Sequence, residues 1–252
     1  MSESVTIDIA QLAGQTGRGV RIAVIDSGVH TSHPHIGGLI AGASVAADGG
    51  VRDGDADDRL GHGTAVAAAI HEKAPGAAII PVRVFDRELT ATIDALVSAI
   101  HWSAGVGASL INLSLGTLNP GHADRLRDAI AAAASAGAVV VAAAPDRDHQ
   151  WLPGGLAGVV AVELDWACPR DRCEVAWTDD GGQVRIRASG FPRPIPGVAP
   201  ERNLRGVSFA VANATGLLAR ALEGVAGSAS PLVAALAAVR EAGRSRRPEP
   251  QL

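Results

Sequence analysis

The sequence contains no tyrosine, and Lys73 is its only lysine. Aromatic residues make up only 3% of the chain, and arginine supplies almost all of the positive charge. We attribute this bias to codon usage rather than to function. The net charge of −4 is small and negative, so no polyanionic partner such as a nucleic acid is indicated.

Cysteine is also scarce, because Cys168 and Cys173 in the segment CPRDRC are the only two. The N-terminal stretch MSESVTIDIAQLAG lacks the basic region and the long apolar segment of a secretory signal. A protein that is not exported keeps its cysteines as reduced thiols. Two ligands are too few for a closed zinc site, which needs four. We therefore expect a cytoplasmic protein with no metal and no cofactor.

Long hydrophobic runs are absent too, and none approaches the roughly 18 residues that cross a membrane. The chain does have 252 residues and 47% hydrophobic content, which suffices for one large core. We expect a single domain over residues 1–243. The polar, proline-containing residues 244–252 are expected to form a frayed tail.

Short runs that are apolar throughout alternate along the chain with amphipathic or alanine-rich stretches of helical length. Strands buried on both faces and joined by helices are typical of a parallel sheet. The sequence therefore predicts an α/β fold of three layers, with a mostly parallel sheet and helices on both faces. The predicted strands are 20–25, 79–84, 110–115, 138–144, 159–164 and 184–187, the predicted helices are 64–71, 92–104, 123–136, 209–222 and 230–242, and loops are expected at 48–60 and 189–205.

Polar residues follow several of these predicted strands. Asp26 follows the first strand, residues 114–117 follow the third, and Asp146 follows the fourth. In open parallel sheets, ligands bind beyond the carboxyl ends of the strands. This edge of the sheet is therefore where we expect the functional site.

Three further motifs contain residue types that suit nucleophilic catalysis. Asp26 stands in VIDSGVHTSHP, His62 in GHGTAVAAAI and Ser208 in GVSFA. Each residue also has an ordinary structural interpretation, as a turn acid, a loop histidine before a helix, and an N-cap serine. A serine at a helix start is equally well placed as a nucleophile, because the positive helix end and free N–H groups lie beside it. Taken singly, the motifs leave both interpretations open.

In the order Asp, His, Ser, the three motifs resemble those of the subtilisin-like serine proteases, the subtilase family. The resemblance spans roughly residues 18–222 and includes INLSLG at 111–116 and VVVAAAPD at 139–146. It implies a serine endopeptidase in which Ser208 attacks a peptide carbonyl, His62 transfers the proton and Asp26 orients the imidazole. It further implies a peptide that pairs with the cleft strand. The substrate-binding residues that it implies are Ser114, Leu115, Gly116 and Ala144.

The sequence departs from the family's pattern at Asp146, which follows Pro145 where the family has Gly-Asn. The family's asparagine donates a hydrogen bond to the oxyanion, and losing one such donor costs about 10²–10³ in rate. A carboxyl group at this position donates only while it is protonated, which requires a strongly raised pKa. Val207 replaces a threonine, so a second donor is missing.

A further departure lies at the N-terminus. The chain begins close to its first predicted strand, with no room for the family's folding pro-segment. We therefore expect a compact form of the family.

Two segments resemble metal sites at first sight. HTSHPH at 30–35 holds three histidines, but the family's SHP turn accounts for one of them without a metal. DGDAD at 53–57 alternates like a calcium loop but lacks the glycine and the terminal glutamate of an EF-hand. We interpret this second segment as a solvated acidic turn.

We expect an active intracellular protease of narrow specificity, which cleaves or ligates a specific peptide, for example a precursor that loses its leader. Its partners would be a peptide or protein substrate and a partner subunit, with no nucleic acid and no membrane. The alternative is a catalytically impaired pseudoprotease that binds peptides or a partner, which Asp146 and Val207 favour. A dinucleotide site at GRGVRIAVIDSG is disfavoured, because its first glycines precede the strand.

Overall fold

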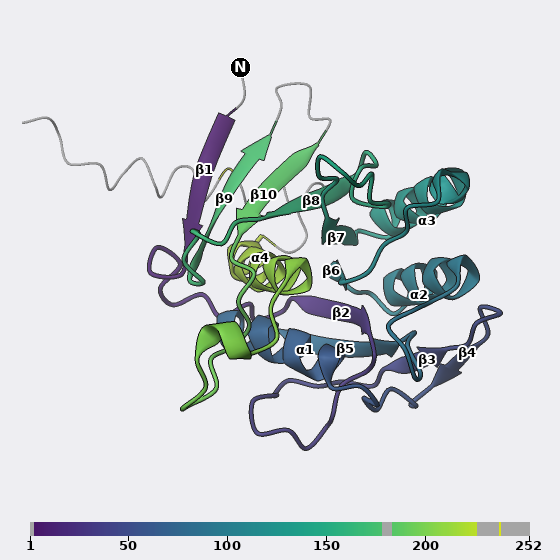
Figure 1. Ribbon diagram of the computed structural model, residues 1–252, viewed down its shortest axis with the longest axis horizontal. Helices are drawn as coiled ribbons and strands as arrows, with labels where there is room; N and C mark the ends of the chain where they lie inside the picture. The colour runs from purple at the N-terminus through teal and green to yellow at the C-terminus, as the bar shows by residue number, and fades with distance from the viewer. Residues whose placement is uncertain (1–2, 178–182, 226–236, 238–252) are drawn as a thin grey trace, which may run out of the picture.

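The computed structural model describes residues 3–177, 183–225 and 237 of the chain (Figure 1). Within them lie four α-helices: α1 (His62–Lys73), α2 (Ile93–Gly105), α3 (Ala123–Ser135) and α4 (Val207–Leu222). Two 3-10 turns, η1 (Pro120–His122) and η2 (Pro200–Arg202), precede α3 and α4. The strands are β1 (Glu3–Asp8), β2 (Arg21–Asp26), β3 (Ala43–Val45), β4 (Val51–Asp53), β5 (Ala78–Arg83), β6 (Leu110–Leu113), β7 (Val139–Ala143), β8 (Val159–Leu164), β9 (Arg172–Trp177) and β10 (Val184–Ala188).

These strands form one ten-stranded sheet in the order β1-β9-β10-β8-β7-β6-β2-β5-β3-β4. From β10 across to β3, every neighbouring pair is parallel. Only the two edges are antiparallel, where β9 pairs with β1 and β10, and β4 with β3. The predicted α/β class and the mostly parallel sheet are confirmed.

Helices cover both faces of the sheet, as predicted. Helices α1 and α4 pack together on one face, and α2 and α3 pack together on the other (Figure 1). Successive residues of β2 alternate between the two layers: Val24 packs on the α1 and α4 side, and Ile25 on the α2 and α3 side. Both side chains are fully buried, and burial of each stabilises the fold by about 1.5–3 kcal/mol. The same alternation turns Asp26, the next residue, toward α1 and α4.

The edges of the sheet differ from the sequence-based expectation. Val51–Asp53, inside the expected loop 48–60, is strand β4, and it is exposed throughout. The run at 20–25 corresponds to the second strand of the chain, because β1 precedes it and pairs with the unexpected strand β9. Edge strands of this kind mix polar and apolar residues, so they lack the apolar run that identifies a buried strand.

The predicted helix at 230–242, apart from residue 237, and the predicted tail at 244–252 lie outside the described residues. The extent of the domain, 1–243, stays a prediction. In the part of the chain that the structure describes, no helix has the length and apolar character needed to span a bilayer.

Candidate active site

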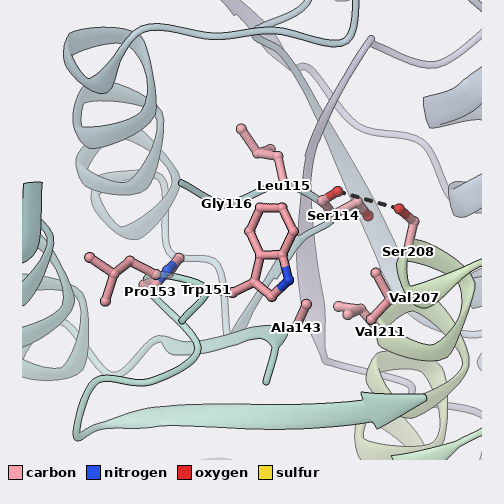
Figure 2. A pocket seen from close by; sticks show the side chains of 10 residues that line it. Ser114, Leu115, Gly116, Ala143, Trp151, Pro153, Val207, Ser208 and Val211 are labelled. Carbon is pink, nitrogen blue, oxygen red and sulfur yellow. Dashed lines mark hydrogen bonds between the residues drawn. The ribbon is translucent and has the colours of Figure 1, made fainter. Parts of the chain in front are cut away.

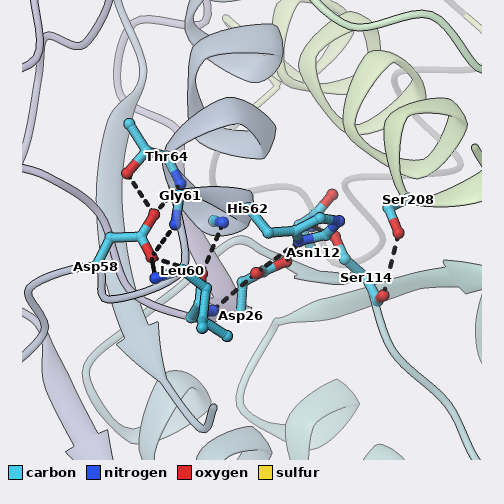
Figure 3. A network of polar contacts seen from close by, with 11 residues as sticks. Asp26, Asp58, Leu60, Gly61, His62, Thr64, Asn112, Ser114 and Ser208 are labelled. Carbon is cyan, nitrogen blue, oxygen red and sulfur yellow. Dashed lines mark hydrogen bonds and ion pairs between the residues drawn. The ribbon is translucent and has the colours of Figure 1, made fainter. Parts of the chain in front are cut away.

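Asp26 and His62 form a hydrogen-bonded pair at the carboxyl end of β2. The side chain of Asp26 is fully buried, and its Oδ1 atom accepts a 2.7 Å bond from the Ser27 backbone N–H. His62 opens helix α1, and its Nδ1 atom lies 2.8 Å from Oδ1 and 3.0 Å from Oδ2 of Asp26 (Figure 3). This contact sets the tautomer that carries its proton on Nδ1 and leaves Nε2 free to accept one.

The charges around His62 favour its protonated form. Burial alone would lower the pKa of His62, but the hydrogen bond that His62 donates to Asp26 and the negative charges of Asp26 and Asp58 outweigh it. The pKa of His62 therefore lies above its ordinary value of 6.5. A base with a raised pKa accepts a proton more readily in the transition state.

Glycine at position 63 allows the two segments to meet. A Cβ atom on Gly63 would lie 2.2 Å from the backbone oxygen of Gly28 and 3.1 Å from the Cβ of Asp26. Any other residue would push α1 away from the end of β2. Gly63 therefore permits the close approach of α1 to the end of β2.

Asp58 is a site residue that the sequence reasoning missed. Its Oδ1 atom accepts bonds from Ser27 Oγ at 2.8 Å and from the backbone N–H groups of Leu60 and Gly61, both at 2.9 Å. Its Oδ2 atom accepts a 2.9 Å bond from the Thr64 N–H (Figure 3). Asp58 thus satisfies N–H groups before and within the first turn of α1, the turn that carries His62.

The protonation of Asp58 reflects this network. Burial by itself would raise the pKa of Asp58, but the hydrogen bonds from Thr64, Leu60 and Ser27 lower it below its ordinary value. Its position four residues before His62, ahead of a helix start, is the signal that a helix-capping argument would have used.

Two other acidic residues, in the segment 53–57, bond to side chains of the protein. Asp53 accepts a 3.0 Å bond from the Trp102 indole, and Asp55 pairs with Arg83 at 2.7 Å. Across the described residues, no group of three or more His, Cys, Asp or Glu side chains is placed to hold a metal ion.

Ser208 lies in the first turn of α4 and is not hydrogen-bonded to His62. Its Oγ donates to the Ser114 carbonyl at 3.4 Å (Figure 3), and no hydrogen bond joins these two described residues, Ser208 and His62. The ring of the next residue, Phe209, lies 5.8 Å from the imidazole ring. The structure thus brings the predicted residues to one end of the sheet, with Asp26 and His62 already paired. Their catalytic roles stay a prediction.

Two buried polar side chains link Ser114 to helix α4 by hydrogen bonds. Thr215 Oγ1 in α4 donates to Asn112 Oδ1 in β6 at 3.0 Å, and Asn112 Nδ2 donates to Ser114 Oγ at 2.9 Å. Thr215 and Asn112 are both fully buried. These bonds fix α4, which carries Ser208, against the strand that leads to Ser114.

A small apolar pocket opens beside Ser208, with a volume of about 110 Å³ (Figure 2). The predicted residues Ser114, Leu115 and Gly116 line it, whereas Ala144 does not. Because side chains alternate along a strand, the neighbouring residue Ala143 takes that place. The remaining lining residues are Trp151, Leu152, Pro153, Val207 and Val211, together with Ser208 itself.

Asp146 does not match the neutral donor that the sequence reasoning considered. Its side chain is 56% exposed, and its Oδ1 accepts backbone N–H bonds from Asp148 at 2.8 Å and from His149 at 2.7 Å. The bond from Asp148, followed by those from His149, lowers the pKa of Asp146. These donors stabilise the ionised form of the side chain, and so they disfavour the protonated carboxyl group. The correspondence of Asp146 with the family's oxyanion asparagine stays a prediction.

Comparison with known sequences relates the chain to one family of proteases. The sequence profile described as the subtilase family matches residues 17–162. Subtilisin BL of Lederbergia lenta is 30% identical over 225 residues, which cover 84% of this chain and 77% of that protein. Thermitase of Thermoactinomyces vulgaris is 36% identical over 140 residues, which cover 51% of this chain and 48% of Thermitase. The chain therefore spans about half the length of Thermitase.

Solved structures share the fold at low sequence identity. Sphericase superposes with a TM-score of 0.67 and 22% identity over 90% of this chain and 87% of its own. A lanthipeptide protease gives a TM-score of 0.63 at 20% identity over 82% and 74% of the two chains. The prenylagaramide maturation protease PagA gives 0.61 at 24% identity over 85% and 79%.

Proposed function

The chain belongs to the subtilase family of serine proteases, and from this premise we propose that it is a serine endopeptidase with Ser208 as nucleophile. His62 is the general base and Asp26 orients it. The observation that carries the proposal is the 2.8 Å contact between His62 Nδ1 and the buried carboxylate of Asp26. That contact leaves Nε2 as the proton acceptor on the side of the imidazole away from Asp26.

The reaction follows from these positions. The Ser208 hydroxyl leaves the Ser114 carbonyl and turns to His62, and its Oγ attacks the carbonyl carbon of the peptide while Nε2 takes its proton. The tetrahedral intermediate collapses as Nε2 returns this proton to the leaving amine. A water molecule then attacks the acyl-enzyme with the same proton transfers, which restores Ser208.

The backbone at the start of α4 stabilises the developing oxyanion. Among the described residues, no acceptor bonds the N–H groups of Val207 and Ser208, and the positive end of the helix dipole lies at the same place. The ionised Asp146 side chain bonds its own loop, so it adds no donor to the oxyanion. We expect a turnover about 10²–10³ below that of a site with a side-chain amide donor.

The substrate in this proposal is a specific peptide, such as a precursor that is processed at one bond. The narrow pocket supports selectivity, and two proteins of similar fold are described as a lanthipeptide protease and a prenylagaramide maturation protease. We place the protein in the cytoplasm, because Cys168 and Cys173 are both free thiols.

A catalytically impaired, peptide-binding protein is the second candidate. The observations that favour it are the Ser208 hydroxyl directed at Ser114 rather than at His62, and the exposed carboxylate of Asp146. Such a protein would bind peptides along the segment 114–116 without cutting them.

A fluorophosphonate probe, which reacts with an activated serine, distinguishes the two candidates. We expect wild type to be labelled on Ser208, as mapped by mass spectrometry, and Ser208→Ala to lose the label. The same preparation should cleave peptides from a degenerate library. Wild type that takes no label and cuts no peptide between pH 5 and 9, yet binds peptides, would support the second candidate instead.

A further inference from the structure

Residues 151–153, at the end of the loop that begins at Asp146, form one wall of the pocket beside Ser208. We propose that Trp151, held by Asp146 and His149, sets the size limit of this pocket, so that the enzyme cleaves after a small aliphatic residue. The inference rests on the proposed function, because it names the side chain that the same site accepts.

Trp151 lies across the pocket rather than beside it. In Figure 2 its indole ring stands between Leu115 and Ala143. A Cβ atom on Gly116 would lie 3.5 Å from Cε3 of Trp151, so the indole packs against the glycine backbone. Thr117 and Leu152 exchange two backbone N–H···O bonds of 2.9 Å, which tie this loop to the wall formed by 114–116.

Asp146 and His149 support the indole from outside the pocket. The His149 ring stacks on Trp151 with a centroid distance of 5.6 Å and an interplanar angle of 28°. His149 Nδ1 lies 3.1 Å from Asp146 Oδ1, and the Asp146 N–H donates to the His149 carbonyl at 3.0 Å. The aspartate that departs from the family's pattern therefore shapes the turn that carries Trp151.

The volume of the pocket decides which side chains it admits. An engineered apolar cavity of about 150 Å³ holds one benzene ring. The pocket here measures about 110 Å³, and no charged side chain lines it. This smaller space favours alanine and valine side chains over a phenyl ring.

The pocket accepts the residue that supplies the attacked carbonyl. The leaving amine must lie at His62, which returns its proton, and His62 does not line the pocket. The acyl side of the peptide therefore extends from Ser208 toward Gly116 and Trp151.

The test uses four peptides that differ only at this residue, which is Ala, Val, Leu or Phe, with kcat/KM measured for each. We expect wild type to prefer Ala or Val over Phe at least tenfold. In Trp151→Ala, the Phe/Ala ratio should rise by about 10- to 200-fold, the range that an added or lost contact in an apolar pocket gives. A ratio of kcat/KM values does not depend on the fraction of enzyme that is folded.

Two supporting variants and one control refine the test. His149→Ala and Asp146→Ala should each raise the Phe/Ala ratio about two- to tenfold, the contribution of one aromatic contact. Trp102→Ala removes an indole on α2 that does not line the pocket, and it should leave the ratio unchanged.

Binding to Ser208→Ala separates this inference from the proposed function. The affinities of Ser208→Ala for the same peptides, measured by calorimetry, should show the same size preference. This preference should weaken in the double variant that also carries Trp151→Ala. Both results are expected even if wild type shows no turnover. A wild type that accepts Phe as well as Ala, or an unchanged ratio in Trp151→Ala, would overturn the role of Trp151. Unchanged ratios in both His149→Ala and Asp146→Ala would overturn their supporting role.

Discussion

Asp58 and Asp146 form the same kind of hydrogen-bonded turn at two ends of the active site. Each carboxylate accepts backbone N–H bonds from residues two and three positions later in its loop. Asp58 is partly buried and also bonds the helix that carries His62, whereas the Asp146 side chain is 56% exposed and bonds only its own turn. In both, the bonds lower the pKa of the carboxyl group.

The difference lies in what each turn carries. The turn at Asp58 leads into the helix that carries His62, the proposed general base. The turn at Asp146 leads to Trp151, the residue proposed to limit the pocket. We therefore expect the loss of a carboxylate to affect catalysis and stability less, the farther that carboxylate lies from His62. Three substitutions test this order.

Asp26→Asn should have the largest effect, because Asp26 touches His62 directly. Losing the carboxylate removes the preference for the proton on Nδ1, and kcat should fall by about 10⁴. The measurement is kcat on a cleaved peptide, with circular dichroism to confirm that the variant is folded. A folded variant that loses less than tenfold would contradict the assigned role of Asp26.

Asp58→Asn should have an intermediate effect. It removes charge-assisted bonds to the first turn of α1, so the free energy of unfolding should drop by about 1–3 kcal/mol at pH 7, as measured by urea denaturation. The folded pKa of Asp58 is lowered, so the stability it supplies is present above the unfolded pKa and is lost as pH falls through the folded value. The two proteins should therefore converge in stability in acid.

The same variant should change the pH dependence of catalysis. The charge of Asp58 contributes to the raised pKa of His62, and the active base is the neutral imidazole. The rising limb of kcat/KM, which the raised pKa of His62 should set in wild type, should move to lower pH in Asp58→Asn. A limb that stays in place would show that Asp58 acts only on stability.

Asp146→Asn should have the smallest effect on rate. The asparagine oxygen still accepts the two backbone N–H bonds, so kcat should change by less than about tenfold. A side chain facing the oxyanion would instead change it by 10²–10³. Asp148→Asn, two residues away, is the matched control. A gain of a hundredfold in Asp146→Asn alone would show that position 146 reaches the oxyanion after all.

The parts of this fold that could be predicted are those in which the residues of one segment are enough to indicate its structure and burial. Residues 22–25 are apolar on both faces, so they indicate a strand between two helical layers without knowledge of the neighbours. Likewise, the glycines around His62 indicate a close approach wherever their partner lies.

The remaining features depend on contacts between segments. β1 and β9 support each other at the sheet edge, and neither has a strong pattern alone. Ala143 and Ala144 differ only in which face of the sheet each points to, so strand register decided which lines the pocket. Trp151 lies in a loop whose path depends on Thr117, a residue distant in sequence.

The bond between Thr215 and Asn112 limits how this enzyme adapts to what it binds. A shift of α4 along its axis would leave the side chains of Thr215 and Asn112 without their hydrogen bond in an apolar interior. The cost would be about 1–3 kcal/mol for each group. The backbone that bears Ser208, the proposed nucleophile, is accordingly the rigid part of the cleft. Accommodation of different ligands has to come from the surface loops around it, such as residues 144–153.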